Sequence, residues 1–108
     1  MGKRLVCVGS SLDDRRDFPA AARRAVGFEP SAVQVGLMPS DFKPMSTVGP
    51  GAYEIRVHVE GEWRVIYVAK FARAVYALHA FHKKSQKTRP EDIEIARTRY
   101  GQAKEAEK

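Results

Sequence analysis

Two neighbouring stretches decide the fold: YEIRVHVE at positions 53–60 and WRVIYVAK at positions 63–70. In the first, apolar and polar residues alternate strictly, which is the pattern of a strand with one buried and one polar face. The second is apolar on both faces apart from Arg64, which suits a central strand. A third apolar run, AVYALHAF at 74–81, follows after a short connection. Three consecutive strands with short loops predict an antiparallel meander.

Charge favours one pairing between the first two strands. A two-residue loop at 60–61 would place Arg64 opposite Val57 on the apolar face, where an unpaired guanidinium is costly. A three-residue loop at 60–62 pairs His58 with Arg64, and Val59 with Trp63, and avoids that cost. This pairing gathers the polar side chains of both strands on one face of the sheet: Glu54, Arg56, His58 and Arg64.

The last helix is predicted by TRPEDIEIARTRY at 88–100. Thr88 and Glu91 form a capping box at its start. Its apolar residues recur at helical spacing and share one face: Ile93, Ala96 and Tyr100. The strand pairing leaves Ile66 and Val68 on the polar face of the sheet, so we expect this helix or a partner to cover them.

The first half of the chain predicts a short strand followed by helices. KRLVCVGS at 3–10 has the β-branched run of a strand. PAAARRAVGF at 19–28 is a good helix former, and a shorter helical piece is expected at 31–37. The prolines and glycines of 38–52 predict a loop. The fold class expected is α+β, with an antiparallel sheet, an N-terminal helical hairpin packed on one face, and a C-terminal helix.

Composition limits the classes of function. The 108 residues fit a single domain spanning 1–108, in which 102–108 are expected to fray. No apolar run approaches the length of a membrane span, and neither Cys7 nor the three histidines stand at metal-ligand spacing. We therefore expect a cytoplasmic protein without a metal, a cofactor or a membrane partner. The net charge of +6 favours an acidic partner, with nucleic acid the first candidate.

Basic residues on the polar face are candidates for binding phosphate. Arg56 and Arg64 lie on adjacent strands, and the guanidinium fork donates two parallel hydrogen bonds to a phosphate. A second basic group follows the third strand: Lys83, Lys84, Lys87 and Arg89. The alternative is that the two arginines only solvate the sheet, as charged runs usually do, by pairing with neighbouring glutamates: Glu54, Glu60 or Glu62.

His79 and His82 are candidates for proton transfer because imidazole titrates near neutral pH. In a regular strand His79 would share a face with Val75, Ala77 and Phe81, where a packed core histidine is the commoner outcome. His82 stands at the strand end beside the lysines, with a plain surface residue as the alternative. The chain has no glycine-rich phosphate loop and no Ser/His/Asp arrangement.

Motifs along nearly the whole chain carry a family resemblance: DFPAAARRAVGFE at 17–29, YEIRV at 53–57, EWRVIYVAKF at 62–71 and LHAFHKKSQKT at 78–88. Together they resemble the HigB-like, often phage-derived, branch of the RelE/ParE toxin superfamily. The resemblance implies a type II toxin that cuts messenger RNA on translating ribosomes and is silenced by a cognate helix-turn-helix antitoxin. The implied reaction needs no metal: the ribose 2′-hydroxyl attacks the adjacent phosphate, giving a cyclic phosphate and a free 5′-hydroxyl.

The resemblance also implies roles for individual residues. Arg56 and Arg64 match positions that hold the scissile phosphate, and Lys83 lies near a further catalytic position. Contacts to messenger or ribosomal RNA are implied for four residues: Lys84, Lys87, His82 and Arg89. His79 lies in the family's L-H-x-F pattern and is either catalytic or structural. The general base stays open among a lysine of lowered pKa, the two histidines and Glu54.

Two departures from the family pattern and three alternatives remain. His82 stands where many relatives have glutamine, and Pro30 interrupts the helical hairpin. Two alternative functions are a gyrase inhibitor of the ParE type and a phage remnant that binds RNA without cutting it. For the oligomeric state, the alternative to a monomer is a dimer.

Overall fold

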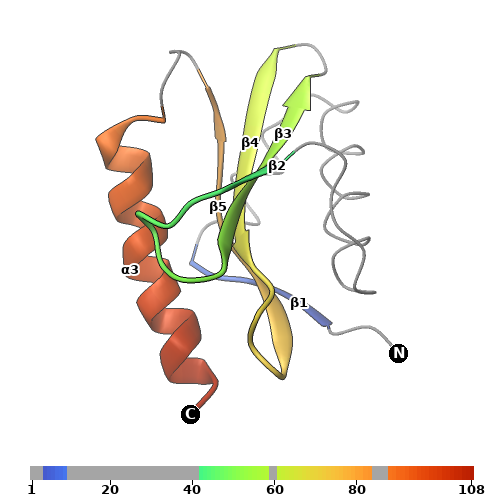
Figure 1. Ribbon diagram of the computed structural model, residues 1–108, viewed down its shortest axis with the longest axis vertical. Coiled ribbons are helices and arrows are strands. Elements are labelled where there is room, and N and C mark those ends of the chain that lie inside the picture. The colour runs from blue at the N-terminus through green and yellow to red at the C-terminus, as the bar shows by residue number, and fades with distance from the viewer. Residues whose placement is uncertain (1–3, 10–41, 59–60, 84–87) are drawn as a thin grey trace.

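The computed structural model describes residues 4–9, 42–58, 61–83 and 88–108 (Figure 1). It contains a five-stranded sheet in the order β1-β5-β4-β3-β2, with a C-terminal helix packed against one face. The elements are β1 (Arg4–Cys7), β2 (Phe42–Pro44), β3 (Ala52–His58), β4 (Glu62–Val68), β5 (Ala74–His82) and α3 (Pro90–Ala106). The helical hairpin expected at 19–28 and 31–37 lies outside the described residues.

The predicted meander is present, because β3, β4 and β5 pair in antiparallel order. The predicted pairing of β3 with β4 was wrong by two residues: Arg64 lies opposite Arg56, not opposite His58. His58 instead pairs with Glu62, and its Nδ1 lies 2.6 Å from the Glu62 Oε2. A shift of two residues keeps every side chain on its expected face. Arg64 therefore still shares the face of Glu54 and Arg56.

The sheet is mixed, so the expected purely antiparallel sheet was wrong. β1 pairs in parallel with β5, from Arg4 opposite Ala74 to Cys7 opposite Ala77. Strands joined by a tight hairpin must be antiparallel, but β1 and β5 are far apart in sequence and are free of that constraint. A short edge strand, β2, also lies in the region expected to be a loop at 38–52. Pro44 at its end is tolerated because an edge strand has no second neighbour to bond.

α3 begins and ends differently from the sequence-based expectation. Its N-cap residue is Arg89, and no side chain caps the helix, so the capping box predicted for Thr88 was wrong. The frayed tail expected over 102–108 is helical as far as Ala106. Ala103 is buried, and the Glu107 carboxylate accepts a hydrogen bond from the Tyr76 hydroxyl at 2.6 Å. These contacts hold the end of the helix on the sheet.

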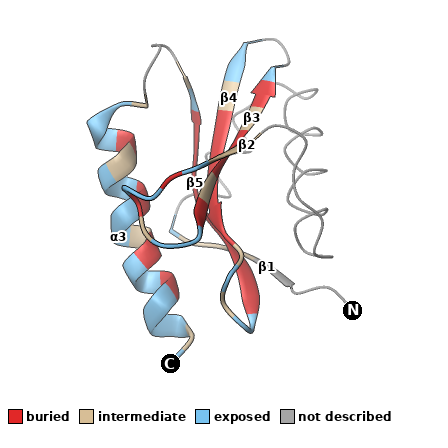
Figure 2. Ribbon diagram, viewed as in Figure 1, coloured by how far each residue is buried: buried red, intermediate tan, exposed pale blue. Residues whose placement is uncertain are grey.

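Both faces of the sheet are buried (Figure 2). Of the two covers expected for Ile66 and Val68, the last helix or a partner, the structure shows the helix: α3 packs on them with Ala96 and Tyr100 in the same cluster. The opposite face carries a second cluster: Ile55, Val57, Val65, Tyr67, Val75 and Ala80. Among the described residues, no helix combines the length and the apolar character needed to cross a membrane.

Candidate functional site

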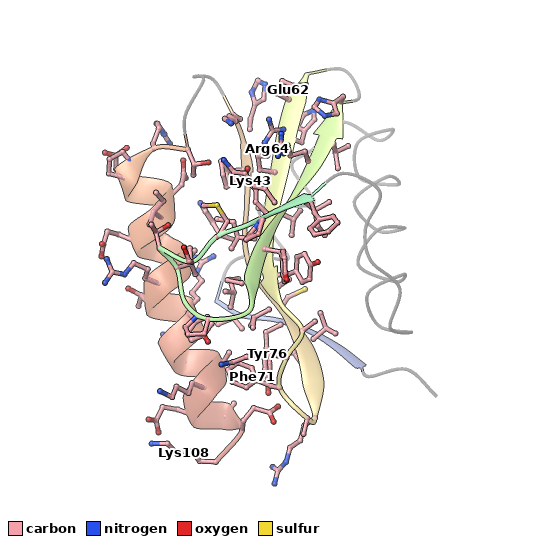
Figure 3. The ribbon with its side chains drawn as sticks, in the orientation of Figure 1. Lys43, Glu62, Arg64, Phe71, Tyr76 and Lys108 are labelled. Carbon is pink, nitrogen blue, oxygen red and sulfur yellow. The ribbon has the colours of Figure 1, made fainter. Side chains whose placement is uncertain are left out.

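Four basic residues from four segments meet at one end of the sheet, on the face that α3 covers further along. Figure 3 labels two of them, Lys43 and Arg64, which lie near each other. We call them the basic cluster: Lys43 of β2, Arg56 of β3, Arg64 of β4, and Lys83 just after β5. The strand pairing sets their positions, since Arg56 lies directly opposite Arg64, and Lys43 lies opposite Glu54. Like charges directly opposite each other destabilise a sheet. The arrangement therefore needs negative charge nearby.

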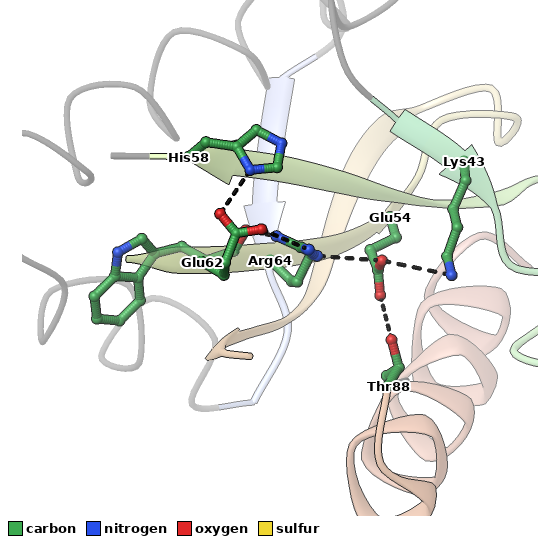
Figure 4. Close-up of polar contacts among 7 residues, drawn as sticks. Lys43, Glu54, His58, Glu62, Arg64 and Thr88 are labelled. Atoms are coloured by element: carbon green, nitrogen blue, oxygen red, sulfur yellow. Dashed lines mark hydrogen bonds and ion pairs between the residues drawn. The ribbon is translucent and has the colours of Figure 1, made fainter. Parts of the chain in front are cut away.

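Glu54 supplies the central negative charge of the basic cluster (Figure 4). Its side chain is fully buried, with an exposed fraction of 0%. One carboxylate oxygen, Oε1, lies 3.5 Å from Arg64 Nε and 4.0 Å from Lys43 Nζ. The other, Oε2, accepts a hydrogen bond from the Thr88 hydroxyl at 2.7 Å. A buried carboxylate is tolerated only when it is paired in this way.

Arg64 is held on several sides, and its side chain is only 5% exposed. Its Nη1 donates to the Trp63 carbonyl oxygen at 3.0 Å, and its Nη2 donates to Glu62 Oε1 at 3.3 Å. Glu62 is half-exposed, and the hydrogen bond from His58 is the largest cause that lowers the pKa of its carboxyl group. The alternative in which the arginines pair with neighbouring glutamates thus holds for Arg64. Its outer contact, with Glu62, faces solvent.

Lys83 has the pKa behaviour of a candidate proton-transfer group. Burial lowers the pKa of its ammonium group, and the nearby charge of Arg64 lowers it further. Lys43 and Arg56 act in the same direction, while Glu54 opposes them. A lowered pKa increases the share of the neutral amine, which is the form that can accept a proton. This direction agrees with the lysine of lowered pKa considered from the sequence.

His79 lies beneath α3 and is buried. Its Nε2 is 2.8 Å from the Asp92 Oδ1, and its ring stacks on Phe81 at 5.0 Å between centroids. From the sequence, His79 was expected to share a face with Val75 and Ala77, which holds only if the strand is regular. A β-bulge opposite Ile66 and Tyr67 breaks the alternation and turns Val75 toward the other face. His79 thus anchors the first turn of α3 and does not border open solvent.

The remaining predicted residues are dispersed. His82 pairs with Trp63 and stacks on it at 4.3 Å between centroids, whereas Phe81 lies opposite Arg64. Because neighbouring side chains alternate, His82 is on the face opposite the basic cluster. Arg89 is exposed, and its hydrogen bond to Asp92 raises its pKa. Lys84 and Lys87 lie outside the described residues.

Sequence reasoning missed two members of the site. Lys43 fell in the region read as a loop, and its only signal was its place between Phe42 and Pro44 at a sheet edge. Thr88 was assigned to a helix cap, but its hydroxyl donates to Glu54 instead. Within the described ranges, no group of three or more His, Cys, Asp or Glu residues is placed to hold a metal ion.

The fold and the basic cluster define a small α+β protein with a cationic site at the end of a mixed sheet. The chain belongs to the phage-derived, Gp49-like protein family (DUF891), whose model matches residues 13–101. This family is one of the RelE/HigB-like toxin families. No curated protein shows significant similarity to the chain.

Proposed function

We propose that this chain is the toxin of a type II toxin-antitoxin system and that it cuts messenger RNA on the ribosome. Membership of a phage-derived, RelE/HigB-like family supports a toxin. The observation that carries the nuclease activity is the basic cluster: Arg64 and Lys43 lie within 4.0 Å of the buried Glu54 carboxylate, Arg56 lies opposite Arg64, and the charges of all four residues act on Lys83. Cations fixed where negative charge develops stabilise the transition state of phosphoryl transfer.

In this proposal the arginines bind the phosphate and the lysines move protons. A guanidinium stays charged in proteins, so Arg56 and Arg64 serve as hydrogen-bond donors to the phosphoryl oxygens. To reach Arg64, the phosphate displaces Glu62 from the outer nitrogen of the guanidinium. Glu62 is half-exposed, so water can solvate its carboxylate when it leaves, and the phosphate takes over its negative charge beside Arg64.

Lys83 is the proposed general base. Its neutral form accepts the proton of the ribose 2′-hydroxyl while the 2′ oxygen bonds to phosphorus. The bond from phosphorus to the 5′ oxygen breaks, and the 5′ oxygen takes up a proton, for which Lys43 is the available lysine donor in the cluster. His79 is left out of the catalytic set because Asp92 and Phe81 enclose it. Contacts of Lys84, Lys87 and Arg89 with the RNA backbone remain predictions.

The partners proposed are messenger RNA on a translating ribosome, ribosomal RNA, and a cognate helix-turn-helix antitoxin that silences the toxin in the cytoplasm. The opposing candidate within the superfamily is an inhibitor of DNA gyrase, and a third is a remnant that binds RNA without cutting it. Binding by charge alone weakens steeply with salt and leaves no cleavage product. RNA cleavage, inhibition of gyrase supercoiling, and salt-sensitive RNA binding without cleavage are therefore the three outcomes that separate the candidates.

Primer extension on a reporter message in a purified translation system, with and without ribosomes, tests this function. Arg56→Ala should lose about a hundredfold or more in cleavage, as happens when a group that stabilises developing charge is removed. Arg97→Ala is the matched control, because it removes the same charge from the exposed face of α3. Ribosome-dependent cuts that weaken only in Arg56→Ala support the proposal. An intact message with wild-type protein, together with inhibition of gyrase supercoiling, would replace it.

A further inference from the structure

We propose that Glu54 is a positioning residue: it fixes the basic cluster and ties the segment that leads into α3 to that cluster through Thr88. The contacts of Glu54 that carry this role do not depend on which reaction the protein performs. The expected effect on RNA cleavage rests on the function proposed above.

Glu54 lies where it can position neighbouring side chains without contacting the RNA itself. Its side chain on β3 is fully buried, and three segments converge on its two oxygens. Lys43 approaches from the edge strand, Arg64 from the central strand, and Thr88 from the segment before α3. A ribose hydroxyl has no open path to a carboxylate enclosed in this way. Glu54 therefore does not serve as the general base considered from the sequence.

The contact between Glu54 and Arg64 controls where the guanidinium points. Glu54 Oε1 and Arg64 Nε are both buried and lie 3.5 Å apart. Neither atom makes a hydrogen bond to any residue that the structure describes. Arg64 Nε thus depends on the charge of Glu54 for compensation, while Glu54 Oε1 has both Arg64 and, at 4.0 Å, Lys43. If the carboxylate loses its charge, Arg64 loses the inner contact that opposes its outer contact with Glu62.

Thr88 extends this arrangement to the helix. Its hydroxyl donates to Glu54 and does not cap α3, whose first turn has no side-chain cap. Thr88 lies just before α3, so its hydrogen bond to Glu54 holds the start of the helix against the basic cluster. Movement at the start of α3 is thereby coupled to the basic cluster.

Glu54 also affects the pKa of Lys83, and the titration of Lys83 is therefore one measurement that tests the inference. Among the residues that the structure describes, the groups whose charges act on the ammonium of Lys83 are Arg64, Glu54, Lys43 and Arg56, and of these only Glu54 raises its pKa. Removing the charge of Glu54 should therefore lower the pKa of Lys83. The acid limb of the pH profile of cleavage should move to lower pH by the same shift.

Three variants test the inference. Glu54→Gln removes the charge and keeps the size of the side chain. Thr88→Val replaces the hydroxyl with a methyl group, and Thr88→Ser keeps the hydroxyl. Glu94→Gln is the matched control for net charge, because Glu94 is exposed on α3 and pairs with Arg97. NMR of the lysine side chains, with Lys83→Arg for assignment, gives the titration of Lys83, and the Arg64 Nε–H signal reports the guanidinium.

The expected result is a lower Lys83 pKa and a shifted Arg64 Nε–H signal in Glu54→Gln, with neither change in Glu94→Gln. Cleavage by Glu54→Gln should fall roughly ten- to a hundredfold, the scale of a misplaced catalytic group. Thr88→Val should shift the Arg64 signal and lower cleavage by a smaller factor, and Thr88→Ser should recover both.

The inference is overturned if a folded Glu54→Gln protein keeps the wild-type Lys83 titration and Arg64 signal. If Glu54→Gln does not fold, Thr88→Val decides: a wild-type Arg64 signal overturns the inference and a shifted one supports it. If wild-type protein cuts no RNA, the proposed nuclease fails, yet both NMR readouts still decide the role of Glu54.

Discussion

Gly49 should be intolerant of any side chain, and this tests the packing that positions α3. A Cβ atom at Gly49 would lie 2.6 Å from Tyr100 Cζ, 2.7 Å from Cε2 and 2.8 Å from Cε1. Carbon atoms do not approach so closely, so the ring or the 49–51 turn would have to move. The ring cannot move freely, because it is buried and its hydroxyl donates to the Pro50 carbonyl at 2.6 Å.

The expected cost of Gly49→Ala has two parts. Overpacking costs about 1–3 kcal/mol. Loss of the Tyr100 hydrogen bond adds about 1 kcal/mol. The free energy of unfolding should therefore fall by roughly 2–4 kcal/mol, and each kcal/mol lowers Tm by roughly 4–8 °C in a domain of this size.

Gly101→Ala is the matched control. Gly101 lies in α3, and an added Cβ meets no atom within 4 Å. Alanine favours a helix over glycine, so this variant should gain about 0.5–1 kcal/mol. Urea and thermal unfolding of both variants give the comparison. Wild-type stability in Gly49→Ala would refute the packing of Tyr100 against the turn.

Two further predictions concern the helix end and the titration of the site. Deleting 102–108 should lower the free energy of unfolding by about 2–4 kcal/mol. The deletion removes the buried Ala103 and the hydrogen bonds that the Glu107 carboxylate accepts from the Tyr76 hydroxyl and the Arg73 backbone N–H. Unchanged urea unfolding would show that the tail contributes nothing. The pKa of Lys83 is lower in the folded chain than in the unfolded chain, so the unfolded chain binds more protons between the two values. Stability should therefore rise with pH through that window, and Lys83→Met should remove that part of the rise; identical pH dependence in both proteins would contradict the burial of the ammonium.

The sequence predicted the three central strands and the polar face because their signals are local. Alternation in 53–60 assigned Glu54 and Arg56 to one face, and the cost of burying an unpaired guanidinium put Arg64 there too. The face on which Arg64 lies is the same for pairings that differ by two residues, so the error in the pairing did not change the predicted face.

The features that could not be predicted depend on contacts between distant segments. β2 has three residues, too few for an alternating pattern, so Lys43 escaped notice. The bulge in β5 reversed the face expected for Val75 and Ala77 relative to His79. Thr88 fits a capping box by spacing, but the buried charge of Glu54 provides a stronger bond than the helix end. Each of these outcomes was decided by tertiary structure over local preference.

The most direct test of the central claim is the chemical nature of the ends that the protein makes on a translated message. Fragments from a purified translation system would be analysed for 5′-hydroxyl and cyclic phosphate ends, with wild type and Lys83→Met compared. We expect 5′-hydroxyl ends that need ribosomes and that nearly vanish in Lys83→Met. Equal cleavage by folded Lys83→Met would contradict the role of Lys83, and an uncut message with folded wild-type protein would contradict the nuclease itself.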